Sequence, residues 1–185
     1  EAGGIQQVPK GISAADAAFL PAAETAISIV HDAHPRLGET VHVFGAGVIG
    51  LLVIACLSAA GSRVVAVEPD EPRRRLALLL GASDAVQPSD TPRKAADVSI
   101  ECSGAPAALQ GAIDSTADCG RVVVASWYGA KQVNLRLGTA FHRSHIEMIA
   151  SQVSEVTGPH ARRWSKAASG NTSQANIPKP HHPLY

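Results

Sequence analysis

The sequence of 185 residues is 45% apolar and 17% charged, which excludes a disordered chain and fits one folded domain. Its 16 basic and 16 acidic side chains leave a formal net charge of zero, so neither a nucleic acid nor an anionic membrane is expected as a partner. The three cysteines lie far apart without a CxxC pair, which favours a reducing, cytoplasmic location over a disulfide framework or a structural zinc site.

Two helices are predicted before the first strand. Ser13 begins the first helix, which reaches Phe19, and Asp16 completes an S-x-x-D capping pattern. Pro21 is expected to break this segment, because proline disrupts a helix interior. A second helix is predicted over residues 24–30.

From residue 40 onward, short β-prone runs alternate with helical segments. Strands are predicted over 40–44, 63–68, 84–87, 97–102, 121–126 and 145–150. Helices are predicted over 48–60, 71–80 and 105–116. Strands separated by helices of about 10–15 residues form βαβ units. The pattern therefore predicts an α/β fold, a doubly wound Rossmann sheet of six parallel strands in the order 3-2-1-4-5-6.

Neither a membrane-spanning segment nor a folded C-terminal segment is indicated by the sequence. The longest apolar run, residues 48–57, is shorter than the roughly 20 residues that span a bilayer. Residues 165–185 are polar, rich in proline and small side chains, and without a period. We therefore predict a folded dinucleotide-binding domain over residues 35–158 and a disordered tail over 159–185.

A glycine-rich turn joins the strand at 40–44 to the helix at 48–60. Gly45, Gly47 and Gly50 form GxGxxG, in which the glycines allow a tight turn, a close approach to pyrophosphate and close helix–strand packing. Glu68 lies at the end of the second strand, where an acid accepts hydrogen bonds from ribose hydroxyls. Strand, glycines, helix and acid together predict a dinucleotide site, with glycines that serve only helix–sheet packing as the alternative.

The same site bears on the choice between NAD and NADP. The carboxylate of Glu68 would repel a 2′-phosphate and so favours NAD. The run Arg73–Arg75 follows shortly after it, and it either neutralises such a phosphate or forms a solvated helix face. Ser103 and Ser126 follow the fourth and fifth strands, at the sheet edge where ligands bind in such folds.

Several separate stretches of the sequence match one known family in the same order. They are residues 38–52, 64–82, 101–109 and 120–154, with Thr25-Ala26 before them. Over residues 13–164 the chain resembles the cofactor-binding half of the medium-chain, zinc-type alcohol dehydrogenase family. The resemblance implies an NAD(P)-dependent oxidoreductase in which the other half supplies the catalytic zinc.

The resemblance also assigns roles to individual residues. It implies that the pyrophosphate is held by Gly45, Gly47, Val48, Ile49 and Gly50. It further implies a ribose contact for Glu68, an adenine-side position for Arg73, a nicotinamide-side position for Thr25, and loops bordering the cofactor at Ser103 and Ser126.

The departures from the family concern its catalytic half. The GroES-like domain that carries most zinc ligands and the proton relay is expected to be missing, with residues 1–34 as its last segment. Pro21 stands where the family often has a further zinc ligand, four residues before Thr25. We therefore predict no catalytic residues and no metal ligands in this chain. Family dimers pair through the outer strand, so a homodimer through residues 145–150 is predicted.

Other chemistry has weaker support in the sequence. His142 and His145 lack a carboxylate or cysteine that would complete a metal site. Tyr128 and Lys131 have the wrong spacing and context for the pair of short-chain dehydrogenases. The alternatives to half of an enzyme are a stand-alone NAD(H)-binding module and a truncated, non-catalytic fragment.

Overall fold

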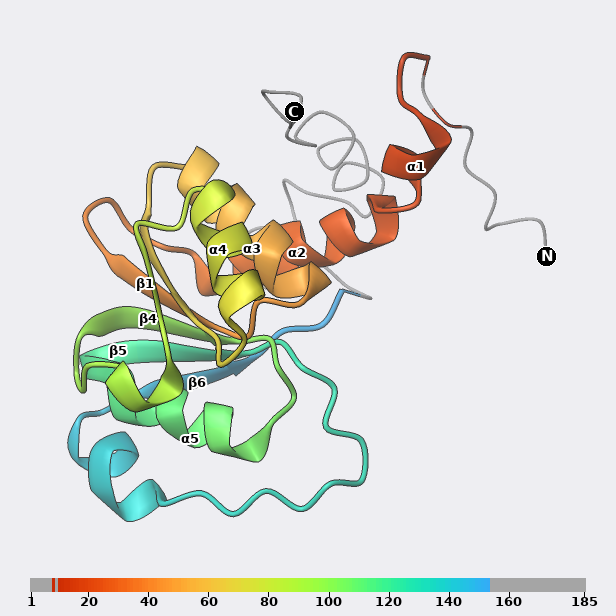
Figure 1. Cartoon of the computed structure of the whole chain (residues 1–185). Coiled ribbons are helices and arrows are strands. Elements are labelled where there is room, and N and C mark those ends of the chain that lie inside the picture. The colour runs from red at the N-terminus through yellow and green to blue at the C-terminus, as the bar shows by residue number, and fades with distance from the viewer. Residues whose placement is uncertain (1–7, 9, 154–185) are drawn as a thin grey trace.

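The computed structural model describes residue 8 and residues 10–153, and within this part six parallel strands form one sheet with helices on both faces (Figure 1). The strand order is β3-β2-β1-β4-β5-β6, which confirms the predicted doubly wound sheet. The predicted tail at 159–185 lies outside the described residues. No helix among those described is long and apolar enough to cross a bilayer.

The strands follow the predicted order with small differences at their ends. Their bounds are β1 Thr40–Phe44, β2 Arg63–Val67, β3 Asp84–Val86, β4 Ala96–Glu101, β5 Thr116–Val124 and β6 Glu147–Ala150. β5 begins earlier than the predicted residue 121, because its first residues pair with β4 before an irregularity shifts the register. The central strands are nearly all buried, as expected for a sheet covered on both faces.

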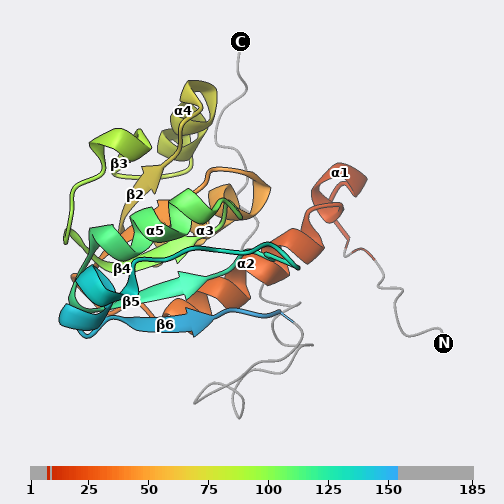
Figure 2. The ribbon, with the colours of Figure 1, turned by 90° about the horizontal axis from the view of Figure 1, so that it is seen from below.

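Three helices cover one face of the sheet (Figure 1), and Figure 2 looks onto the opposite face, with α5 in front. They are α2 (Leu20–Ala33), α3 (Val48–Ala59) and α4 (Glu71–Leu79). Alternate residues of the strands, such as Val41 and Val43 in β1, point to this face and pack against α2 and α3. This layer forms the larger hydrophobic core and holds the start of α3 at the carboxyl end of β1.

The opposite face is covered by α5 (Pro106–Ser115) and by a short helical turn, η2 (Leu137–Phe141). Phe44 of β1 and Val67 of β2 point to this side, one residue out of phase with those that face α3. They pack with Leu109 and Ile113 of α5 in a second core. A 3₁₀ turn, η1 (Pro88–Asp90), follows β3.

The N-terminal helices correct one prediction. Ser13 caps the short helix α1 (Ala14–Ala17) and accepts the amide of Asp16, as predicted. The two predicted helices are separate, but the break lies at residues 18–19 and α2 begins at Leu20 rather than Glu24. Pro21 therefore lies in the first turn of α2, where its missing N–H has no partner to lose. The segment preceding the predicted domain therefore contributes α2 to the same core as the sheet, whereas α1 lies away from it (Figure 1).

A largely buried ion pair ties the loop before β1 to β5. Nη2 of Arg121 donates to Oε2 of Glu39 at 2.6 Å, and the amide of Arg36 donates to the same oxygen at 2.7 Å. Burial of Glu39 opposes its ionisation, but the bonds from Arg121 and Arg36 outweigh it and lower the pKa of this carboxyl. The pair fixes the approach of the chain to the central strand.

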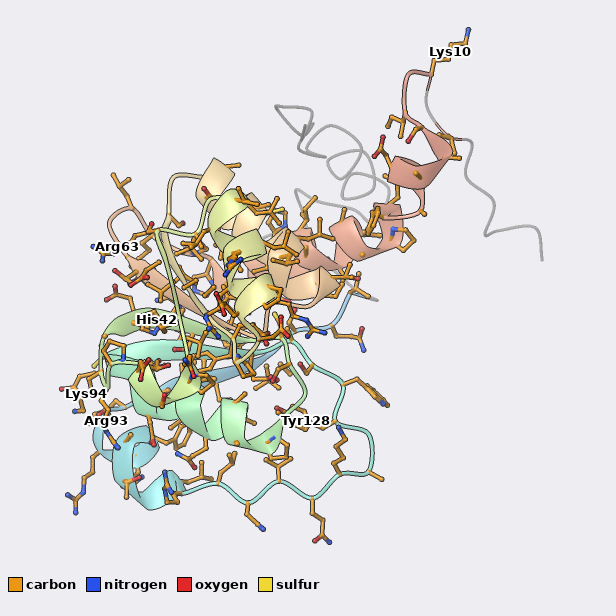
Figure 3. All side chains as sticks on the ribbon, viewed as in Figure 1. Lys10, His42, Arg63, Arg93, Lys94 and Tyr128 are labelled. Atoms are coloured by element: carbon orange, nitrogen blue, oxygen red, sulfur yellow. The ribbon has the colours of Figure 1, made fainter. Side chains whose placement is uncertain are left out.

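A polar network joins the strands β1, β4 and β5 to the end of α5, and Figure 3 labels its histidine, His42. His42 of β1 is 2% exposed, and its Nδ1 lies 3.2 Å from Oγ of Ser115. Ser115 in turn lies 3.2 Å from Oγ of Ser99, which accepts a bond from Thr116. Burial lowers the pKa of His42, and the charge of Arg63 lowers it further.

The neutral form of His42 is therefore the one that the folded state accommodates, and stability should depend on pH. The contribution is complete above the unfolded pKa of 6.5 and is lost as pH falls below it, because the unfolded chain then binds a proton that the folded chain resists. We expect the melting temperature to fall as the pH is lowered from 7.5 to 5.5. This group can lower the free energy of unfolding by at most about 1.4 kcal/mol per pH unit.

Thermal denaturation of His42→Asn checks this, since the amide keeps a polar atom near the Nδ1 position but does not titrate. The variant is expected to lose less stability over the same pH interval, whatever its stability at pH 7.5. Replacement of the exposed His142 by Asn is the control and should leave the wild-type slope unchanged. An unchanged slope in His42→Asn would contradict the assignment.

Candidate functional site

The glycine-rich turn lies between the end of β1 and the start of α3. Gly45 has a φ of +96°, and its amide donates to the carbonyl of Val67 at 2.9 Å. A Cβ on Gly50 would lie 1.9 Å from the carbonyl oxygen of Gly45. The helix therefore begins directly against the backbone of the turn, which requires glycine at both positions.

Gly47 has neither of these restraints. Its φ of −74° and ψ of −172° are accessible to any residue, and a Cβ built on it would meet no atom within 4 Å. It is the N-cap of α3, and no side chain caps this helix. The amides of the first helical turn have no acceptor within the helix and form the positive end of its dipole. Open space in front of such amides is the geometry that receives a phosphate group.

Glu68 follows β2 and is 4% exposed. Its Oε2 accepts the amide of Ala46, inside the glycine-rich turn, at 2.7 Å, and its Oε1 accepts the amide of Asp70 at 3.0 Å. The acid predicted to bind ribose therefore also braces the turn in this structure. Because each carboxylate oxygen can accept two bonds, capacity remains for a ligand hydroxyl.

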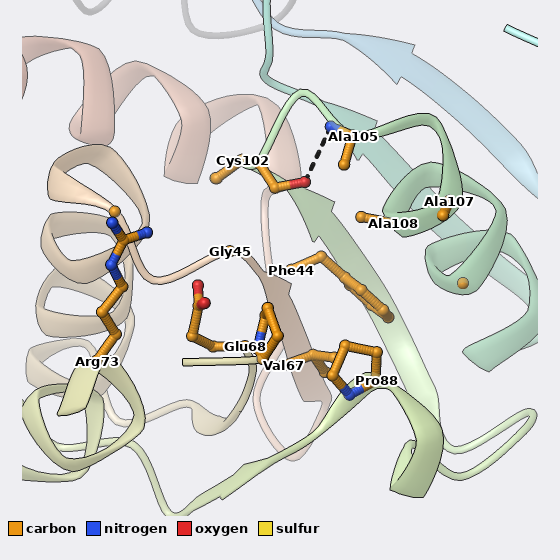
Figure 4. A pocket seen from close by; sticks show the side chains of 14 residues that line it. Phe44, Gly45, Val67, Glu68, Arg73, Pro88, Cys102, Ala105, Ala107 and Ala108 are labelled. Carbon is orange, nitrogen blue, oxygen red and sulfur yellow. Dashed lines mark hydrogen bonds between the residues drawn. The ribbon is translucent and has the colours of Figure 1, made fainter. Parts of the chain in front are cut away.

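A pocket of about 460 Å³ opens at the carboxyl ends of β1, β2 and β4 (Figure 4). Its lining is mostly apolar and consists of Phe44, Gly45, Gly47, Val67, Glu68, Pro69, Arg73, Pro88, Cys102, Ser103, Ala105, Ala107, Ala108 and Gly111. The chain runs outward from β1 to β3 on one side and from β4 to β6 on the other, so the strand order reverses here. Ligands of open α/β sheets bind at this reversal.

The three consecutive arginines have different surroundings. Arg73 lines the pocket near Glu68 (Figure 4). Arg74 donates through Nη1 to the carbonyls of Glu68 and Pro69, and Arg75 forms an exposed ion pair with Glu71. Arg73 is therefore the member of the run that is placed to meet a ligand.

Ser103 connects the pocket to the end of β4. A Cβ on Gly45 would lie 2.8 Å from Cβ of Ser103, so the two turns are in direct contact. Glu101, the last residue of β4, is fully buried, and its Oε1 accepts the Ser103 amide at 2.6 Å, the Ser103 hydroxyl at 2.7 Å and the Gly104 amide at 2.9 Å. The sequence prediction did not include Glu101. An acid at a strand end followed by Cys-Ser-Gly is the signal that would have found it.

Other predicted residues lie beside the pocket or outside its lining. Val48 and Ile49 form the first turn of α3 next to Gly47, with Val48 exposed. Thr25 lies on α2, and its hydroxyl donates to the carbonyl of Pro21 at 3.0 Å. Ser126 follows β5, and its hydroxyl lies 3.4 Å from the Glu101 carbonyl oxygen. The structure therefore gathers the glycines, Glu68, Arg73 and Ser103, and leaves Thr25 and Ser126 apart from this pocket.

The apolar wall of the pocket was not predicted. Phe44 and Pro88 form one side of it, and Ala105, Ala107 and Ala108 at the start of α5 form another (Figure 4). Small side chains in the first turn of a helix leave room for a flat group such as a base. The run of alanines around Pro106 is the corresponding sequence signal.

The described residues offer no set of donors for a metal. No group of three or more His, Cys, Asp or Glu side chains comes together among them. Cys102 lines the pocket, where burial and the neighbouring Glu101 raise the pKa of its thiol. These residues therefore do not fit a zinc ion.

Comparison with known proteins identifies the relatives of this chain. The family described as zinc-binding dehydrogenase matches residues 48–167. D-guloside 3-dehydrogenase of Escherichia coli (strain K12) is 30% identical over 173 residues, which cover 88% of this chain and 49% of that protein. The chain spans about half the length of the curated relatives it matches most fully.

Solved structures likewise match this chain over about half of their own length. The 2R,3R-butanediol dehydrogenase from Bacillus subtilis superposes with a TM-score of 0.73 at 26% identity, covering 94% of this chain and 50% of that one. A zinc-binding dehydrogenase from Sinorhizobium meliloti 1021, bound to NADP, superposes with a TM-score of 0.75 at 21% identity, covering 92% and 51%. The fold described here is therefore one half of these proteins.

The contact between Gly50 and Gly45 gives a prediction about stability. We expect Gly50→Ala to lower the free energy of unfolding by roughly 1–3 kcal/mol, because the new methyl group forces α3 away from the turn. Urea denaturation measures the change. Gly138→Ala, at a glycine with open space around it, is the control and should have little effect. A Gly50→Ala variant as stable as the wild type would contradict the close approach.

Proposed function

The chain belongs to the zinc-binding dehydrogenase family, and we propose that it is the nucleotide-binding half of an NAD(P)-dependent, alcohol dehydrogenase-like oxidoreductase. When bound, the nicotinamide cofactor supplies hydride acceptance or donation. The described residues of this chain would bind and orient it.

The space beside Gly47 is the observation that carries the proposal. Neither backbone conformation nor packing within the protein requires glycine at this position. A pyrophosphate approaching the uncapped end of α3 does require it, because a side chain would stand between the phosphate and the amides of Val48, Ile49 and Gly50.

The remaining contacts follow from the shape and charge of the pocket. Glu68 would accept the ribose hydroxyls, since it is held in place by two backbone amides and keeps unused lone pairs. The adenine ring would lie against Phe44, Pro88 and the alanines that begin α5. The loops at Ser103 and Ser126, and Thr25 on α2, would border the second half of the cofactor.

For the cofactor itself, we propose NAD rather than NADP. The buried carboxylate of Glu68 is fixed at the pocket wall and would repel a 2′-phosphate. Arg73 is the opposing group, since its side chain lines the same pocket. Titration with NADH and NADPH separates these effects: NADPH is expected to bind more weakly, and equal affinities would show that Arg73 compensates for the carboxylate.

A binding titration of the 185-residue chain with NADH, followed by fluorescence of the reduced nicotinamide, tests the proposed site. Gly47→Asp is the decisive variant, because aspartate is a favourable N-cap but places a negative side chain where the phosphate would lie. We expect the melting temperature to stay the same or rise, and the dissociation constant for NADH to increase by at least about tenfold.

Gly138→Asp is the matched control, since it adds the same charge away from the pocket lining and should bind NADH normally. Unchanged NADH affinity in Gly47→Asp would contradict the proposed site. Hydride transfer by the wild-type chain alone would exclude a module that only binds NAD(H). Absence of both NADH binding and cooperative unfolding would favour a non-functional fragment.

We also propose that two copies pair through β6. This strand is bonded to β5 along one side, and no other strand in the described part of the chain pairs with its outer side. An unpaired strand edge is a template for association with another strand. Light scattering of the 19.1 kDa chain is expected to give twice the monomer mass as concentration rises. A monomer at high concentration would contradict this pairing.

A further inference from the structure

Glu101 has contacts on two sides of the sheet's carboxyl edge. Its Oε1 accepts the bonds from Ser103 and Gly104 that shape the pocket wall. Its Oε2 accepts the hydroxyl of Tyr128, in the loop after β5, at 2.9 Å. All of these partners donate a hydrogen bond, so the buried carboxylate acts only as an acceptor. Its two oxygens thereby connect two separate loops.

Further bonds hold the loop after β5 against the end of β4. The amide of Ala125 donates to the carbonyl of Glu101 at 3.0 Å, and Nζ of Lys131 lies 3.3 Å from the carbonyl oxygen of Gly104. The ring of Tyr128 is half-buried and packs on the second core, and this packing holds the hydroxyl in place to reach Glu101. Trp127, the residue before Tyr128 in this loop, is 84% exposed and does not belong to the second core.

Tyr128 does not have the features of a catalytic tyrosine. Its burial raises the pKa of the phenol, and the hydrogen bond to Glu101 and the charge of that carboxylate raise it further. A tyrosine that donates a proton in catalysis needs a pKa nearer neutrality. The phenol therefore keeps its proton and donates its hydrogen bond to Glu101, and this bond holds the loop at the end of β4.

The place of this loop on the sheet indicates what the bond between Tyr128 and Glu101 does. A doubly wound sheet binds a dinucleotide across its reversal point, with one nucleotide half on each side. The pocket is lined from the ends of β1 and β2, the turn after β4 and the start of α5, and no residue of the loop after β5 lines it. The second half of the dinucleotide would therefore extend past the turn after β4 to the carboxyl end of β5, where the loop begins. We infer that Glu101, acting through Tyr128, positions the loop after β5 for the second half of the dinucleotide. This inference rests on the proposed dinucleotide site.

Ligands of two lengths test the inference in the 185-residue chain. AMP occupies only the adenosine half, whereas NADH occupies both. Tyr128→Phe removes the hydroxyl and keeps the packed ring. We expect its dissociation constant for AMP to stay within about twofold of the wild type and that for NADH to rise by about fivefold, the lower end of typical couplings between sites. The anisotropy of Trp127 emission in the free protein should fall, because the loop becomes more mobile, measured in a Trp164→Phe background.

Tyr185→Phe is the matched control, because it removes the same hydroxyl from the other tyrosine of the sequence, and it should leave both affinities and the anisotropy unchanged. Equal weakening of AMP and NADH in Tyr128→Phe would overturn the inference, since it would indicate a general effect on the fold. Unchanged NADH affinity in that variant would also overturn it, as would a wild-type chain that binds NADH no more tightly than AMP. Failure of the wild type to bind either ligand would overturn the proposed function and this inference together.

Discussion

The close approach of α3 to the turn after β1 is the constraint on which the rest of the site depends. A Cβ on Gly50 would lie 1.9 Å from the carbonyl oxygen of Gly45, so the helix begins in close contact with the backbone of the turn that precedes it. This contact aims the free amides of the helix at the reversal point of the sheet, where the pocket opens. The helix is held there by an apolar stripe buried against β1, β2 and α2.

Two buried carboxylates support this geometry from neighbouring strands. Glu68 after β2 binds the amide of Ala46 in the first turn, and Glu101 at the end of β4 binds the amides of Ser103 and Gly104 in the second. The two turns meet where Gly45 lies against Ser103. Backbone amides that would otherwise remain without partners at the sheet edge are thereby satisfied, and both turns are fixed before any ligand arrives.

Much of the fold follows from local signals in the sequence. The β-prone runs, the glycines that end the helices and the GxGxxG turn predict the doubly wound sheet and the turn at which we propose that the cofactor binds. The differences arise where a local rule has two outcomes. Pro21 is compatible with a helix break or with a first turn, and the burial of Ala23, Ala26 and Ile27 against the core selects the first turn. The early start of β5 depends on pairing with β4, which no local pattern of residues 116–120 indicates.

The sequence by itself determined the fold, the family and the glycine-rich turn, because these depend on residue type at fixed spacing along the chain. Only the tertiary structure decided what Glu101 and Tyr128 do, because a part-buried hydrogen bond joins these residues, 27 positions apart, between the end of β4 and the loop after β5. It likewise separated the three arginines, since the neighbours of each guanidinium are set by the packing of α4 beside β2. Spacing along the chain identifies groups that repeat a known pattern, whereas hydrogen bonds across the sheet edge depend on where the strands end.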